Sequence, residues 1–127
     1  KTWPHREHSI AIDPGDGSVW ISGNGDDDGF IVKYAADGKF MLRIGSSGPS
    51  RGSTDIGQLG RASGLVVDPE SHELFVADGY ANRRVIVFDT RTGAYTRHWG
   101  AYGRGPIDGP VADRASQLMQ PHGIALS

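Results

Sequence analysis

The chain has 127 residues, a formal net charge of −2 and no cysteine. Its length suits one ordinary domain, and the near balance of charge argues against nucleic acid or an anionic membrane as a partner. Without cysteine there is neither a disulfide framework nor a thiolate metal site. No apolar stretch approaches 18 residues, so we expect no membrane-spanning segment, and the first residues do not read as a signal peptide.

Alternating apolar and polar residues dominate the sequence and predict two sets of four β-strands. The strands are expected near Ser9–Asp13, Val19–Gly23, Phe30–Ala35 and Lys39–Ile44, and then near Gly64–Asp68, Leu74–Ala77, Arg84–Asp89 and Ala94–Trp99. Turn-forming residues separate these runs: DPGDG at 13–17, ADG at 36–38, DPESH at 68–72 and RTG at 91–93. No window has the apolar spacing of a helix. The predicted fold class is therefore all-β.

The two sets of strands are copies of one another. HSIAIDP at 8–14 matches SGLVVDP at 63–69, and both resemble HGIALS at 122–127. A repeated four-stranded meander is typical of β-propeller blades. The sequence predicts a blade at about 8–45 with a loop at 46–61, a blade at about 63–100 with a loop at 101–120, and the first strand of a further blade at 121–127.

Two blades and one strand do not close a propeller, which usually has four to eight blades. Such a piece would leave apolar faces and strand edges exposed. We expect the missing blades to come from a longer parent chain or from other copies of this chain in a homo-oligomer. The last residues lie within a strand motif, which favours the longer chain.

The residue just before each blade's first strand is expected at the mouth of the central channel. This position holds His8, Ser63 and His122 in the three repeats. Imidazoles from different blades could meet at one metal ion, because a catalytic zinc often has three protein ligands and one open position. The alternative is that these histidines pack or form hydrogen bonds between blades.

The duplicated motifs resemble the NHL-repeat β-propellers over nearly all of the chain. Within that group, the order His8, Ser63, His122 and the DGYANRR turn at 78–84 are most similar to the lyase domain of the peptidyl-α-hydroxyglycine α-amidating enzymes. That resemblance implies a reaction in which a hydroxylated C-terminal glycine is cleaved to a peptide amide and glyoxylate. It also implies an extracellular or periplasmic location.

By the same resemblance, His8 and His122 match zinc ligands and Tyr80 matches the catalytic tyrosine. The backbone carbonyl of Ile10 matches a calcium contact in the channel. Tyr80 would take a proton from the substrate hydroxyl, because nearby positive charge favours a phenolate. The third zinc histidine and the catalytic arginines would lie on further blades. Ala81 stands where the animal enzymes have a cysteine.

Other residues in the turns have simpler interpretations. Tyr80 could instead pack over the blade edge, and Asp78 and Arg84 are expected to hold the turn by an ion pair or hydrogen bonds. The segment Asn24–Gly29 matches half of a calcium loop, but Ala35 stands where such a loop needs a glutamate, so a solvated turn is expected. His5, His72 and His98 are assigned no site.

Two functions of different classes are left open. The first is a scaffold propeller that presents its channel mouth and the loops at 46–61 and 101–120 to a protein, a peptide or a small molecule, because a fold alone does not fix a function. The second is the zinc-dependent lyase, with zinc and calcium as cofactors.

Overall fold

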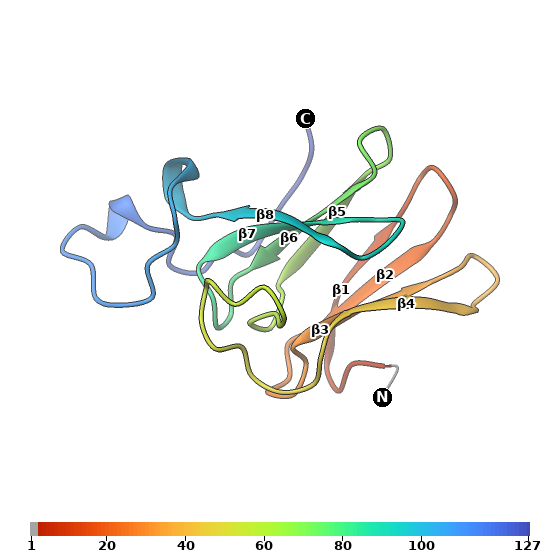
Figure 1. Ribbon diagram of the computed structural model, residues 1–127, viewed down its shortest axis with the longest axis horizontal. Helices are drawn as coiled ribbons and strands as arrows, with labels where there is room; N and C mark the ends of the chain where they lie inside the picture. The colour runs from red at the N-terminus through yellow and green to blue at the C-terminus, as the bar shows by residue number, and fades with distance from the viewer. Residues whose placement is uncertain (1–2) are drawn as a thin grey trace.

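The computed structural model describes residues 3–127, which form two antiparallel four-stranded sheets side by side (Figure 1). The first sheet has the strands β1 (Glu7–Ile12), β2 (Val19–Gly23), β3 (Phe30–Tyr34) and β4 (Phe40–Gly45). The second has β5 (Gly64–Asp68), β6 (Glu73–Asp78), β7 (Arg84–Asp89) and β8 (Tyr95–Trp99). In each sheet the strands follow chain order. The all-β prediction is confirmed, and the arrangement is consistent with part of a β-propeller.

The two sheets share their strand order and a glycine turn between their third and fourth strands. Gly38 in the β3–β4 turn has a φ of 87°, and Gly93 in the β7–β8 turn has a φ of 76°. Both values lie in the left-handed region that glycine adopts without steric cost. Each of these hairpins also has a register shift near the turn end of its third strand, at Lys33/Tyr34 in β3 and, one residue further from the turn, at Val87/Phe88 in β7. The two sheets therefore follow similar but not identical backbone paths.

A shared apolar core joins the two sheets. β1 lies beside β5, so the facing sides of both sheets become buried together. This core consists of Trp20, Ile31, Ile44, Leu59, Ala62, Leu65, Val67, Leu74, Val76, Ile86 and Phe88. Burying a side chain of the size of leucine or isoleucine contributes about 1.5–3 kcal/mol. A smaller cluster of Ile21, Phe30 and Val32 lies outside this core, on the first sheet.

The structure differs from the expected strand boundaries in two places that bear on function. β1 begins at Glu7, so His8 lies within the strand, at a register shift between Glu7 and Ser9, rather than just before it. Residues 121–127 were expected to start a strand but form none. A strand needs a hydrogen-bonded neighbour, and none of the eight described strands pairs with this segment.

The two long loops contact each other. Ser53 in the loop at 46–61 hydrogen-bonds through its backbone N–H and its hydroxyl to the Asp108 carboxylate in the loop at 101–120. The second loop extends away from both sheets (Figure 1) and has two short 3-10 helices, Ala101–Gly103 and Arg114–Ser116. The described residues contain no helix long and apolar enough to cross a membrane.

Candidate functional site

Three residues that are far apart in the sequence meet at one end of the sheets. The Tyr80 Oη atom lies 2.8 Å from His8 Nε2 and 2.9 Å from His122 Nε2. The three rings meet edge to face, with centroids 5.0–5.4 Å apart. The structure therefore brings together the three residues that the sequence analysis selected as a catalytic tyrosine and two metal ligands.

The hydrogen bonds within this cluster constrain its protons. A phenol has one proton, so Tyr80 can donate to only one of the two imidazoles. The other imidazole must carry hydrogen on Nε2 and donate to the phenolic oxygen. The cluster thus holds the Tyr80 oxygen between one hydrogen-bond donor and one hydrogen-bond acceptor.

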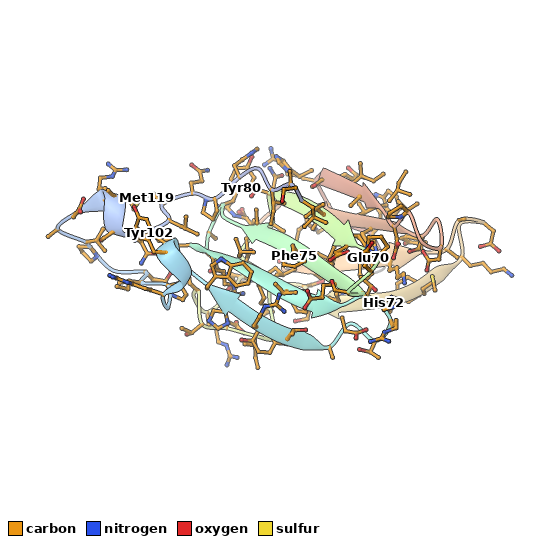
Figure 2. The ribbon with its side chains drawn as sticks, turned by 90° about the horizontal axis from the view of Figure 1, so that it is seen from above. Glu70, His72, Phe75, Tyr80, Tyr102 and Met119 are labelled. Carbon is orange, nitrogen blue, oxygen red and sulfur yellow. The ribbon has the colours of Figure 1, made fainter. Side chains whose placement is uncertain are left out.

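Tyr80 is placed by the turn between β6 and β7, and a buried ion pair fixes that turn. The Arg84 Nε atom lies 2.9 Å from the Asp78 carboxylate, and both side chains are fully buried. Burial raises the pKa of the Asp78 carboxyl, opposed by Arg84, by the Asn82 side chain and by a backbone N–H. The expectation that Asp78 and Arg84 pin the turn is confirmed. Figure 2 shows Tyr80 and His72 at opposite ends of the second sheet, with Phe75 between them.

The loop at 46–61 completes the support of the Tyr80 turn. The Gly60 N–H donates to Asp78 at 2.7 Å, and the Ala81 N–H donates to the Gly60 carbonyl at 2.8 Å. The Arg84 guanidinium donates to two more carbonyls of this loop, those of Ser53 and Gln58, each at 3.0 Å. A set of buried donors and acceptors this complete holds a turn in one conformation.

His122 is held by the packing of its neighbour Pro121. Pro121 lies directly against the backbone of Gly79, where any Cβ atom would overlap the Pro121 carbonyl. The same carbonyl lies 2.7 Å from the hydroxyl of Ser63, which also lies 2.9 Å from the Ala77 carbonyl. Ser63 and Gly79 therefore dock the segment at 121–127 onto the second sheet beside Tyr80.

The segment before His8 is fixed by backbone hydrogen bonds to Asp28. The Asp28 carboxylate, which is fully buried, accepts the backbone N–H groups of His5 at 2.7 Å and Arg6 at 2.9 Å. It also accepts the Gly25 N–H at 3.0 Å, which closes the turn at 24–29. Asp28 is thus a buried structural acceptor, whereas a wholly solvated turn was expected. The register shift in β1 then follows directly before Ser9.

The two imidazoles meet part of the requirement of a zinc site. Both Nε2 atoms converge on one point, and neutral imidazole is a common zinc ligand. The described residues contain no group of three His, Cys, Asp or Glu side chains that could hold a metal ion, so a third ligand of these types would come from outside them. Ile10 lies on β1 two residues after His8, with its side chain 67% exposed.

Two supporting features were not predicted from the sequence. Ser63 was noted only as the residue at the repeat position of His8 and His122, yet its hydroxyl anchors the segment that carries His122. The loop at 46–61 was expected to connect the two blades and to present a binding surface, but not to support the turn that carries Tyr80. Its carbonyls face a buried guanidinium, and the pattern of Gly, Ser and Pro in the loop does not indicate that pairing.

No family model matches the chain. Over 120 residues, 94% of the chain, it is 26% identical to the peptidylglycine alpha-amidating monooxygenase of Rattus norvegicus. Over 119 residues, also 94% of the chain, it is 26% identical to the peptidyl-glycine alpha-amidating monooxygenase of Mus musculus. The chain spans 11% of the length of each of these relatives. It is therefore similar to one short part of the amidating enzymes.

Proposed function

We propose that this chain carries part of the reaction centre of a zinc-dependent, lyase-like enzyme of the peptide-amidating type. The observation that carries the proposal is the convergence of Tyr80 Oη on the Nε2 atoms of His8 and His122. The similarity to the amidating enzymes over 94% of the chain supports it. The NHL type of the propeller, and an extracellular or periplasmic location, belong to the same proposal.

The reaction has a simple balance of bonds. The substrate is a peptide whose C-terminal glycine carries a hydroxyl group on its α-carbon. The hydroxyl loses its proton and becomes the aldehyde oxygen of glyoxylate. The bond between the α-carbon and the amide nitrogen breaks, its electron pair stays on nitrogen, and the nitrogen takes up a proton. The products are a peptide amide and glyoxylate, and no oxidant is needed.

In this proposal Tyr80 is the proton acceptor. Its oxygen is fixed by contacts to two side chains, and the turn that carries it is pinned by buried polar groups. A base held in place in this way acts on a hydroxyl that lies within hydrogen-bond reach.

His8 and His122 would hold zinc through the same Nε2 atoms that now contact Tyr80. When bound, zinc supplies a Lewis acid that polarises a substrate oxygen. Zinc held by His8 and His122 would need both Nε2 atoms unprotonated. The Ile10 carbonyl remains our candidate contact for a channel calcium ion.

The test is the release of glyoxylate from a peptide that ends in α-hydroxyglycine, measured on the intact protein with its full set of blades. We expect Tyr80→Phe to keep the bound zinc and to lose the activity at least about a hundredfold, the usual scale for loss of a general base. The matched control is Tyr95→Phe, which removes a phenolic hydroxyl from the outer strand β8. If Tyr80→Phe retains full activity, the proposed mechanism fails.

A scaffold function is the second candidate, and the long loops favour it. The loops at 46–61 and 101–120 are joined through Ser53 and Asp108 and expose large apolar side chains. These are Ile56 at 55%, Tyr102 at 79% and Ile107 at 54% exposure. A protein, peptide or small-molecule ligand could bind there without any chemistry at His8. Further blades, from a longer chain or from other copies, would complete the ring in either case.

A further inference from the structure

A pocket of about 370 Å³ lies beside the turn between β6 and β7, next to Ala81, the residue that follows Tyr80. Its walls come from the turn at 24–29, from the loop at 46–61 and from Ala81. In an antiparallel sheet, the start of the first strand and the turn between the second and third strands lie at the same end. The pocket therefore lies at the same end of the sheets as His8 and Tyr80.

Arg61 contributes the cation of this pocket. Its guanidinium lies 3.1 Å from the Asp26 carboxylate and 3.5 Å from the Tyr80 carbonyl. The Asp26 side chain is 99% exposed and that of Arg61 is 37% exposed, so their ion pair contributes little free energy. A guanidinium has five N–H donors, and these two contacts leave most of its fork available to a ligand in the pocket.

The backbone of Arg61 has an uncommon conformation. Arg61 has a φ of 60°, in the left-handed region that non-glycine residues rarely adopt. A glycine would adopt this conformation without cost, as glycines do elsewhere in the chain. Strained residues of this kind are concentrated at ligand-binding and catalytic sites. His72 and Tyr102 adopt the same conformation, with φ values of 57° and 56°, so the case for Arg61 rests on its place in the pocket.

We propose that Arg61 and this pocket form a subsite for a single carboxylate group carried by a peptide. A carboxylate matches the planar fork of a guanidinium and can replace the weak contact with Asp26. Pro49, Leu59 and Ala81 provide apolar wall for the rest of the ligand. Asp26 and Asp27 line the same pocket, so the ligand carboxylate must displace Asp26 from Arg61, and a second negative charge on the ligand is disfavoured. The peptide class rests on the proposed function, whereas the carboxylate preference rests on the pocket alone.

The experiment is calorimetric titration of the intact protein with blocked dipeptides in the presence of a chelator, so that neither zinc nor catalysis is involved. N-acetyl-leucyl-glycine offers a terminal carboxylate, and N-acetyl-glutamyl-glycinamide offers a side-chain carboxylate. N-acetyl-leucyl-glycinamide offers none. We expect one or both of the acids to bind at least about tenfold more tightly than the neutral amide, as for hydrogen bonds to a charged group.

Two variants separate binding from folding. Arg61→Gly removes the guanidinium and the backbone strain, and Arg61→Gln removes only the charge. We expect both to reduce binding of the acids to the level of the neutral amide, and Arg61→Gly to unfold at a denaturant concentration no lower than wild type. Arg104→Gln, on the exposed loop at 101–120, is the control and should bind as wild type.

The proposal is overturned if the acids and the amide bind equally to wild type. It is also overturned if Arg61→Gly binds the acids normally, if it unfolds more easily than wild type, or if Arg104→Gln weakens binding as much. Binding of the acids with no glyoxylate release would overturn the proposed function and leave the subsite standing. Release of glyoxylate together with unchanged binding of the acids by Arg61→Gly would overturn the subsite and leave the proposed function standing.

Discussion

At the scale of single residues, the buried pair of Asp78 and Arg84 decides whether the Tyr80 turn keeps its shape. Arg84 donates to Asp78 and to two carbonyls of the loop at 46–61, so one guanidinium joins three backbone segments. A buried pair of this kind is a weak source of net stability, but loss of one partner leaves an uncompensated charge. The main effect of the pair is therefore to fix the conformation of the turn between β6 and β7, and its net contribution to the free energy of unfolding is small.

We predict that Asp78→Ala lowers the free energy of unfolding by about 3–5 kcal/mol, because Arg84 then stays buried without its counter-charge. Chemical denaturation monitored by tryptophan fluorescence measures this. The control is Asp37→Ala, which removes the same charge from an ion pair with Lys39 whose side chains are 59% and 84% exposed. That change should cost no more than about 1 kcal/mol. Equal effects of the two substitutions would refute the assigned role of Asp78.

At the same scale, Asp55 predicts how stability depends on pH. Burial alone would raise the pKa of the Asp55 carboxyl. Hydrogen bonds outweigh this effect and lower the pKa to about 2; they come from the N–H groups of Arg51 and Gly57 and from the Arg51 side chain. The pKa in the unfolded chain is near 3.8. Because the folded value is lower, the stabilisation is complete above pH 3.8 and is lost as the pH falls toward 2.

We predict that Asp55→Asn flattens this part of the pH profile. The free energy of unfolding, measured between pH 5 and pH 2, should fall more steeply for wild type than for Asp55→Asn, by at most about 2 kcal/mol over the range. Taking the difference between the two curves removes the contribution of the other carboxylates. Parallel curves would mean that the loop at 46–61 does not depend on the Asp55 charge.

At the scale of elements, the docking of the segment at 121–127 on the β6–β7 turn places His122. Gly79 allows this contact, because a Cβ atom there would overlap the Pro121 carbonyl. We predict that Gly79→Ala displaces the segment, separates His122 from Tyr80 and weakens zinc binding, while circular dichroism still reports the two sheets. Gly105→Ala is the control, since nothing lies near its Cβ position. Wild-type zinc affinity in Gly79→Ala would contradict the docking.

The sequence was sufficient to predict the elements whose pattern is local. Strands and hairpin turns follow from alternation and from turn residues such as Gly38 and Gly93, which depend on their neighbours in the chain. The register shift at the start of β1 was not predicted, because it depends on pairing with β2. The segment at 121–127 was predicted as a strand because its sequence matches the first strand of the repeat. The prediction was wrong because the motif carries no information on whether a partner strand lies beside the segment.

The candidate site was predicted in part, and for a different reason. His8 and His122 were selected because they occupy equivalent positions in the predicted repeat, and Tyr80 because the sequence of its turn resembles one in the amidating lyases. The repeat supplied the approximate geometry. The contacts of Ser63, Gly60 and Arg61 with this site were not predicted, because they join loops whose relative positions only the folded core determines.

At the scale of the whole molecule, two similar sheets and a docked segment bring three distant parts of the chain to one point. The core between the sheets fixes β1 relative to β5, and so fixes His8 relative to the β6–β7 turn that carries Tyr80. Any chemistry at this point therefore depends on packing between the two sheets rather than on either sheet alone.

The most direct test of this account is the zinc content per chain of the intact protein after dialysis, measured by atomic spectroscopy. We predict that His8→Ala and His122→Ala each lose zinc, because each removes one imidazole ligand, and that Tyr80→Phe keeps it. His72→Ala, at the opposite end of the second sheet, is the control and should keep its zinc (Figure 2). If His122→Ala retains the zinc of the wild type, the shared metal site does not exist and the scaffold function remains.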